Sequence, residues 1–230
     1  MPKYSLLSLS KPKSAVAEAY RTLRTNIQFA NVDEVVKKIL VTSAGPGEGK
    51  SSTVANLGAV LAQAGKSVLI IDADLRNPSQ HKIWNRMNIN GLSTTLVNDI
   101  HTLSYVIETD QENLSVLFAG PIPPNPAELL GSKRMKKVLQ EASAAYDILL
   151  IDSPPTIAVS DSAVLAQSVD GVLLVVAYGE VSRDFALQAK QQLEKVGAKI
   201  IGAILNKVEL KTKDYYYYYQ YHGETHSASL

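Results

Sequence analysis

The chain has 230 residues, 46% of them apolar, which is enough for one well-buried domain. Its 23 Lys and Arg residues nearly balance its 22 Asp and Glu residues, so nothing in the overall charge favours nucleic acid or an anionic membrane as a direct partner. The absence of Cys excludes a disulfide framework and a thiolate metal site. No apolar run approaches the roughly 18 residues of a membrane span, so we expect a soluble protein that reaches a membrane only through a partner.

Short apolar runs alternate with helical patterns along the chain. After a first expected helix at residues 15–29, aliphatic and β-branched residues at consecutive positions predict strands buried on both faces. These strands are expected at residues 38–42, 67–71, 114–118, 148–151, 172–177 and 200–205, with helices at 51–64, 132–145, 160–167 and 183–196 and a proline-containing loop that ends in a short helix at 120–130. The alternation predicts an α/β fold, in which a mainly parallel central sheet has helices on both faces.

A glycine-rich segment, AGPGEGKSS, follows the first expected strand at residues 44–52. Its glycines let backbone amides turn toward phosphate oxygens at the N-terminus of a helix. Lys50 is placed to reach the β- and γ-phosphates and the Ser51 hydroxyl to bind Mg²⁺, although Ala44 stands where the usual pattern begins with Gly. The segment therefore predicts a nucleotide-binding P-loop made of Gly45, Gly47, Glu48, Gly49, Lys50, Ser51 and Ser52.

Carboxylates end two of the other expected strands. Asp72 and Asp74 follow the second run and Asp152 follows the fourth. Ligands bind at the carboxyl ends of strands in such sheets, and a Mg²⁺ nucleotide needs hard oxygen ligands there. This arrangement favours metal binding and catalysis over the ordinary use of Asp in caps and turns. Asn206, at the end of the last run, is either an adenine ligand or a turn former.

The C-terminal segment carries six of the eleven tyrosines within its last sixteen residues. Five consecutive Tyr residues fit neither an amphipathic helix nor a strand with one wet face. The phenol hydroxyls are therefore the expected functional groups, and the alternative is an aromatic contact surface for a partner. We call this set the tail tyrosines: Tyr215, Tyr216, Tyr217, Tyr218, Tyr219 and Tyr221.

Taken together, these motifs resemble those of the bacterial tyrosine kinases. The Walker A segment is at residues 44–51, Walker A′ (LIIDADLR) at 69–76 and Walker B (LLIDSPP) at 149–155, and a tyrosine cluster follows. The resemblance covers nearly the whole chain. It implies a P-loop NTPase of the Walker A/A′/B type, with a kinase domain at residues 1–208 and a flexible tail at 209–230 that is phosphorylated.

The resemblance also assigns roles to residues. Lys50 and Ser51 would hold the phosphates of ATP and Mg²⁺, and Asp152 would be the Walker B carboxylate that completes the metal site. Asp72 and Asp74 would share metal positioning and acceptance of the tyrosine proton, with the choice between them left open. The tail is long enough for its tyrosines to receive phosphate either in the active site of the same chain or in that of a neighbouring subunit. A ring of subunits implies transfer to the neighbouring subunit.

Partners are implied as well. The segment EAYRTLR matches a family pattern that joins subunits into a ring, through Glu18, Arg21 and Arg24, while the simple alternative is a pair within the helix. The family accompanies capsular and exopolysaccharide export. A chain without a membrane span resembles the version from low-GC Gram-positive bacteria, in which the transmembrane activator is a separate protein. We therefore expect a cytoplasmic homo-oligomer that is recruited to the inner face of the membrane by its activator and opposed by a phosphotyrosine phosphatase.

A second function fits the same P-loop class. Partition and division-site ATPases use ATP to switch between monomer and dimer on DNA or on a membrane. They carry a second lysine early in the P-loop, where this chain has Gly45, and they lack a tyrosine tail. The chain also lacks the terminal basic amphipathic helix of the membrane-binding kind, so the kinase is the preferred interpretation.

Overall fold

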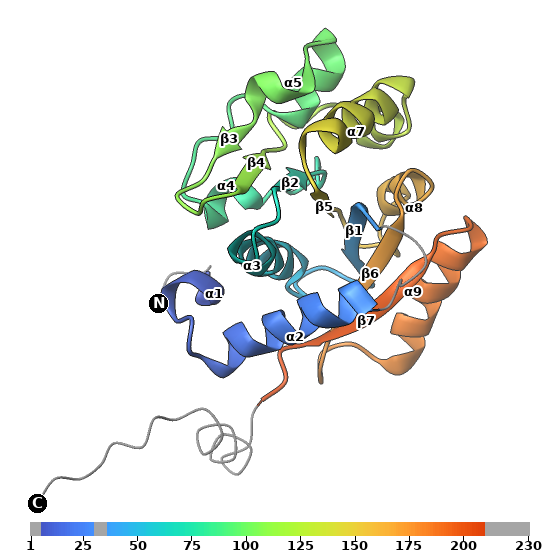
Figure 1. The fold of residues 1–230 in the computed structure, drawn as a ribbon. Helices are drawn as coiled ribbons and strands as arrows, with labels where there is room; N and C mark the ends of the chain where they lie inside the picture. Colours follow the sequence, from blue (N-terminus) through green and yellow to red (C-terminus); the bar gives the residue numbers. More distant parts are fainter. Residues whose placement is uncertain (1–5, 30–35, 210–230) are drawn as a thin grey trace, which may run out of the picture.

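A central sheet runs through the computed structural model, which describes residues 6–29 and 36–209 (Figure 1). Within these ranges the sheet has seven strands in the order β3-β4-β2-β5-β1-β6-β7. All neighbouring strands are parallel except β3 and β4. The strands are β1 (Lys38–Ser43), β2 (Val68–Asp72), β3 (Ile107–Glu108), β4 (Leu114–Leu117), β5 (Ile148–Asp152), β6 (Gly171–Ala177) and β7 (Ile200–Asn206).

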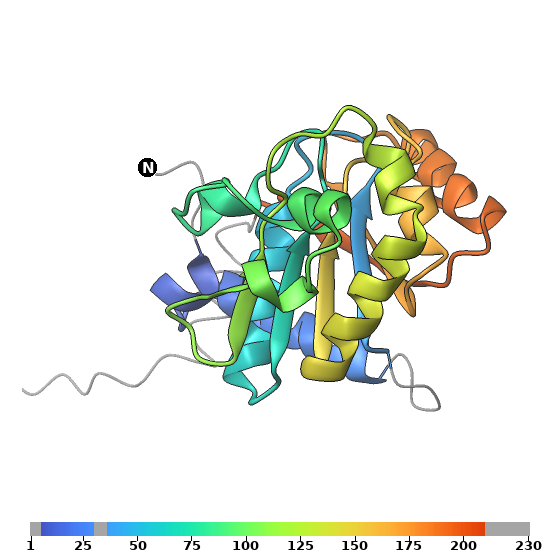
Figure 2. The ribbon, with the colours of Figure 1, turned by 90° about the horizontal axis from the view of Figure 1, so that it is seen from above.

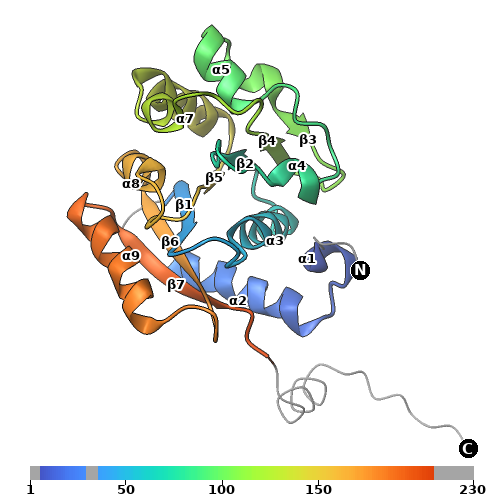
Figure 3. The same cartoon turned by 180° about the vertical axis from the view of Figure 1, so that it is seen from behind.

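Helices cover both faces of the sheet, as Figures 1 and 3 show from opposite sides. One face packs against α1 (Leu7–Ser10), α2 (Ala15–Phe29) and α3 (Lys50–Gln63). The other face packs against α5 (Leu92–Asn98), α6 (Pro126–Leu130), α7 (Lys133–Ala145), α8 (Asp161–Ala166) and α9 (Arg183–Lys195). Helix α7 lies along the strands on its face (Figure 2). Two short helices, α4 (Gln80–Ile83) and the 3₁₀ helix η1 (Thr102–Tyr105), complete the described elements.

Alternate residues of the central strands supply the two halves of the core. In β5, Leu150 packs on the α3 side while its neighbours Leu149 and Ile151 pack on the α7 side, and all three are buried. Because both faces are covered, the strand shows a continuous apolar run in the sequence. Helix α3 comes very close to the sheet at Gly58, where an added Cβ would lie 2.9 Å from Ile70 Cδ1. This close packing fixes the N-terminal end of α3 at the carboxyl edge of the sheet.

The predicted fold class is confirmed, but several elements differ, and the short helices α1, α4, α5 and η1 were not predicted. The last strand was expected to be buried on both faces, but β7 is an edge strand that is only partly covered, and Leu205 is 58% exposed. The sequence also did not predict β3, because two residues are too short to show a period. None of the helices in the described ranges is both long enough and apolar enough to cross a bilayer.

Candidate active site

The P-loop connects the end of β1 to the start of α3 and is closed by its own hydrogen bonds. Ser43 Oγ donates to the Gly45 carbonyl oxygen at 2.6 Å, and Gly45 N donates to Glu48 Oε1 at 2.5 Å. Gly47 and Gly49 adopt φ values of 78° and 90°, a region that side chains disfavour. The loop therefore turns back on itself immediately before the N-terminus of α3, as a phosphate cradle requires.

Glu48 has a side-chain role that the motif did not reveal. Its carboxylate is almost fully buried and also accepts a hydrogen bond from Ala177 N, at the end of β6, at 3.0 Å. The side chain thus ties the loop to the sheet, and only the main chain of Glu48 is left to serve the predicted nucleotide contact. Asn206 Nδ2 donates to the Glu48 carbonyl oxygen at 2.8 Å, so the end of β7 supports the loop as well. An adenine contact from Asn206 stays a prediction.

Asp72 and Asp152 lie side by side, because they are paired in the register of β2 and β5. Both residues are fully buried. Asp72 Oδ2 accepts from the backbone amides of Ser79 and Gln80 at 3.1 and 3.0 Å, and Asp152 Oδ2 accepts from Gln80 Nε2 at 2.9 Å. The Oδ1 atoms of both carboxylates have no hydrogen-bond partner among the described residues. Two buried oxygens thus lack a partner within the described residues at the carboxyl edge of the sheet, and a metal ion bound there would satisfy them.

Burial dominates the electrostatics of these carboxylates. It raises the pKa of Asp72 well above its ordinary value, and the charge of Asp152 raises it further. Burial also raises the pKa of Asp152 to about 6, and the nearby Ser51 hydroxyl and the charge of Lys50 oppose the rise. Burial likewise raises the pKa of Asp74. The hydrogen bond from Asn77 N and the charge of Lys50 oppose this rise. Lys50 therefore lies where a single positive charge acts on both Asp74 and Asp152.

The residues fit a magnesium site completed by a nucleotide. Within the described residues no three acidic or histidine side chains converge to hold an ion by themselves. Mg²⁺ keeps several waters and binds through one or two carboxylates plus substrate phosphates, which matches two open carboxylate oxygens beside the P-loop. Ser51 is connected to these carboxylates through Ser79, because its hydroxyl accepts a hydrogen bond from Ser79 Oγ at 2.7 Å and Ser79 N donates to Asp72 Oδ2.

The sequence did not predict two residues that contact the P-loop serine and the carboxylates, Ser79 and Gln80. Ser79 contacts Ser51, and Gln80 contacts Asp152, Asp72 and the carbonyl oxygen of Ser51. In the sequence these residues appear only as a polar pair a few positions after Asp72 and Asp74. The pair belongs to no recognised motif and to no predicted strand, so nothing marked it as part of the site.

Arg76 is the last residue of the Walker A′ segment, and no role was predicted for it from the sequence. The structure places its guanidinium against buried Asp161 in a two-bond pair of 2.9 and 3.0 Å, which fastens the segment after β2 to helix α8.

The predicted interface residues lie on α2, away from the carboxyl edge of the sheet. Arg21 Nη1 and Glu18 Oε2 form an ion pair of 2.7 Å. The structure therefore contains the pair within the helix that was the alternative to a subunit interface. Arg21 also donates to the Pro12 carbonyl oxygen, and Arg24 donates to that of Val60 in α3 at 3.1 Å. The subunit interface stays a prediction. The tail tyrosines lie outside the described residues.

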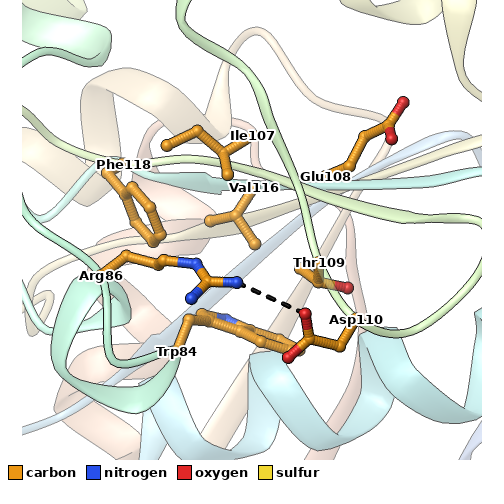
Figure 4. Close-up of a pocket in the computed structure, with 8 residues that line it drawn as sticks. All are labelled: Trp84, Arg86, Ile107, Glu108, Thr109, Asp110, Val116 and Phe118. Carbon is orange, nitrogen blue, oxygen red and sulfur yellow. Dashed lines mark hydrogen bonds and ion pairs between the residues drawn. The ribbon is translucent and has the colours of Figure 1, made fainter.

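A small pocket at the β3–β4 edge is separate from the P-loop (Figure 4). Its volume is about 20 Å³, too small for a nucleotide. Arg86 and Asp110 form a 3.4 Å ion pair beside the indole of Trp84 there. The full lining is Trp84, Arg86, Ile107, Glu108, Thr109, Asp110, Val116 and Phe118.

Comparison with known proteins agrees with this geometry. The model of the ParA family, described as NUBPL iron-transfer P-loop NTPase, matches residues 34–229. The chain is 46% identical over 215 residues to tyrosine-protein kinase YwqD of Bacillus subtilis, covering 94% of this chain and 91% of that protein. It is 41% identical over 210 residues to the putative tyrosine-protein kinase CapB of Staphylococcus aureus, covering 91% and 92%. The chain belongs to the bacterial tyrosine kinase family of ParA-type P-loop NTPases.

A solved structure supports the same assignment. The kinase domain of the Escherichia coli tyrosine kinase ETK superposes with a TM-score of 0.84 at 33% identity, over 92% of this chain and 84% of that one. The expected enzyme class, a protein-tyrosine kinase, is confirmed by these relatives. The ParA match by itself fits a partition ATPase equally well, and the high identity to the kinases decides between the two functions.

Proposed function

We propose that the protein is an ATP- and Mg²⁺-dependent autokinase that phosphorylates the tail tyrosines of neighbouring subunits. The observation that carries the proposal is the pair of buried carboxylates, Asp72 and Asp152, whose open oxygens lie next to the P-loop serine. Phosphoryl transfer needs a positioned nucleotide, neutralised phosphate charge and an in-line hydroxyl, and little covalent help from the protein. A tyrosine that reaches this edge of the sheet therefore suffices as a substrate.

Different residues bind the phosphates, bind the metal ion and accept the proton in the proposed reaction. The amides of the P-loop and the charge of Lys50 would bind the phosphates, and Ser51 and Asp152 would hold the metal ion together with Asp74, the ligand predicted from the sequence, or with Asp72, whose Oδ1 has no partner among the described residues. When bound, Mg²⁺ neutralises charge on the phosphates. Asp72 or Asp74 accepts the proton of the incoming tyrosine. Burial raises the pKa of both carboxyls toward the range in which a general base works near neutral pH.

Membership of the family supports a proposal for the pathway and the partners of the enzyme. We propose a role in capsular or exopolysaccharide synthesis and export, with a separate transmembrane activator and a phosphotyrosine phosphatase as partners. The ETK structure is described as a kinase domain, so in that protein the kinase is one part of a larger whole. Here the corresponding remainder would be the activator, which would also bring the kinase to the inner face of the membrane.

Two variants test transfer between subunits. An active chain whose six tail tyrosines are changed to Phe is mixed with a full-length Lys50→Met chain, ATP and Mg²⁺. Phosphotyrosine on the Lys50→Met chain is the expected result, because only a neighbour's site could have modified it. The Lys50→Met chain alone is the control. If the mixture stays unmodified while the wild-type chain modifies itself, transfer occurs within one chain and the proposal of a neighbouring site is wrong.

A further inference from the structure

Gln80 joins the three motifs of the site although it belongs to none of them. It is the first residue of α4 and is fully buried. Its backbone N donates to Asp72 Oδ2 at 3.0 Å, and its side-chain Nε2 donates to Asp152 Oδ2 at 2.9 Å and to the Ser51 carbonyl oxygen at 3.1 Å. One residue thus contacts the Walker A, A′ and B segments together.

Trp84 fixes the direction in which the Gln80 amide points. Its indole Nε1 donates to Gln80 Oε1 at 3.2 Å. An indole nitrogen is only a donor, so it must face the amide oxygen. A reversed amide would place its NH₂ against the indole N–H and its oxygen against the Asp152 carboxylate, and both contacts would be repulsive. The amide therefore has one favourable orientation, with both of its N–H donors directed at the site.

The fixed Gln80 amide in turn holds the Asp152 carboxylate in place. Gln80 holds the Oδ2 atom of this carboxylate, while the Oδ1 atom has no partner within the part of the chain that the structure describes. A carboxylate held by one oxygen keeps its other oxygen at a constant place, and groups that orient metal ligands in this way strengthen metal binding. The Trp84 ring is itself held by the pocket of Figure 4, with the Arg86–Asp110 pair beside it.

We propose that Gln80 is a positioning residue for the metal–nucleotide site and that Trp84 acts through Gln80 by orienting its amide. The inference rests on the proposed use of ATP and Mg²⁺ at this site. Neither residue touches the reacting atoms in this account. Their effect is to keep the open oxygen of Asp152 and the backbone of Ser51 in one arrangement, before and during nucleotide binding.

Two substitutions isolate the two parts of this arrangement. Gln80→Met keeps the length of the side chain and removes the donors to Asp152 and Ser51. Trp84→Phe keeps an aromatic ring in the pocket and removes the donor to Gln80, together with part of the ring volume. Arg86→Ala is the matched control, because it removes the Arg86–Asp110 ion pair from the same pocket without a contact to Gln80.

The first readout is binding, which does not depend on kinase activity. Calorimetry measures the affinity for a non-hydrolysable ATP analogue with and without Mg²⁺. We expect Gln80→Met to reduce the Mg²⁺-dependent gain in affinity about tenfold, the lower end of the 10- to 100-fold range typical of residues that orient metal ligands. Metal-free affinity should stay within about twofold, because the P-loop amides and Lys50 are unchanged. Trp84→Phe should show a smaller effect, and adding it to Gln80→Met should change nothing more.

The second readout is the rate of tail phosphorylation. In Gln80→Met we expect the Mg²⁺ concentration for half-maximal rate to rise several-fold and kcat to fall, with KM for ATP little changed at saturating Mg²⁺. Arg86→Ala should match the parent in both readouts. The proposal is overturned if Gln80→Met keeps the parental Mg²⁺ dependence in binding, or if Trp84→Phe and Arg86→Ala behave alike.

The proposed function and the proposed role of Gln80 would fail in different experiments. If the parent binds the analogue with Mg²⁺ but phosphorylates no tyrosine, the proposed function is wrong while the binding readout still decides the role of Gln80. Should Gln80→Met not fold, as judged by circular dichroism, the comparison of Trp84→Phe with Arg86→Ala decides by itself.

Discussion

Replacing Asp152 with Asn should make the nucleotide-free protein more stable while removing its activity. Asp152 is fully buried beside Asp72, so its charged form is disfavoured in the folded state. An Asn side chain has the same shape and can still accept from Gln80 Nε2 through its oxygen. It cannot supply the negative charge that the metal requires, so phosphorylation should be lost.

The size of the effect follows from the pKa of Asp152, which burial raises from 3.8 to about 6. The folded state therefore holds the proton more tightly than the unfolded state. Stability is greatest when the group is protonated, falls as the pH rises from about 4 to 6, and is constant above that range. The rise corresponds to about 3 kcal/mol at neutral pH. For a chain of this length, Asn should raise the unfolding midpoint by about 6–12 °C at pH 7.5.

Urea and thermal unfolding at pH 7.5 in EDTA measure this difference. The advantage of Asp152→Asn should shrink as the pH is lowered toward 4, and Mg²⁺ with ATP should stabilise the parent more than the variant. Asp110→Asn is the control, because its side chain is fully exposed and should change stability by less than about 0.5 kcal/mol. An Asp152→Asn variant that is less stable than the parent in EDTA would refute the reasoning from buried charge.

Three further predictions concern the P-loop and α2. Lys50→Met should abolish tail phosphorylation and leave cooperative unfolding intact; phosphotyrosine in this variant would exclude the P-loop as the transfer site. Gly49→Ala should lower both stability, by about 1–3 kcal/mol, and nucleotide affinity in calorimetry, because the new Cβ would lie 2.1 Å from Asn206 Nδ2 at a φ of 90°. An unaffected Gly49→Ala variant would contradict the described loop. Arg21→Glu combined with Arg24→Glu should give a folded monomer in light scattering, and an unchanged mass would return α2 to a purely internal role.

The sequence predicted those parts of the site that depend on local signals. A buried strand followed by a glycine-rich loop, and carboxylates such as Asp72 and Asp152 at the ends of strands, are visible within a few residues. Their convergence then follows from the parallel sheet, because its carboxyl ends share one edge.

The sequence did not predict contacts that depend on packing. Glu48 reaches Ala177 across 129 positions of the chain, so its buried carboxylate could not be separated from the loop motif that contains it. Gln80 and Trp84 belong to a four-residue helix and the residue after it, which is too short to give a periodic pattern. The partial exposure of β7 likewise follows from its place at the edge of the sheet, which an apolar run does not reveal.

The most direct test of the account is the intact mass of the purified chain after incubation with ATP and Mg²⁺, followed by mapping of the modified residues. We predict successive additions of phosphate that map to the tail tyrosines, with none in the Lys50→Met chain. Hydrolysis of ATP without phosphate on any tail tyrosine would contradict the account and support the nucleotide-dependent switch instead.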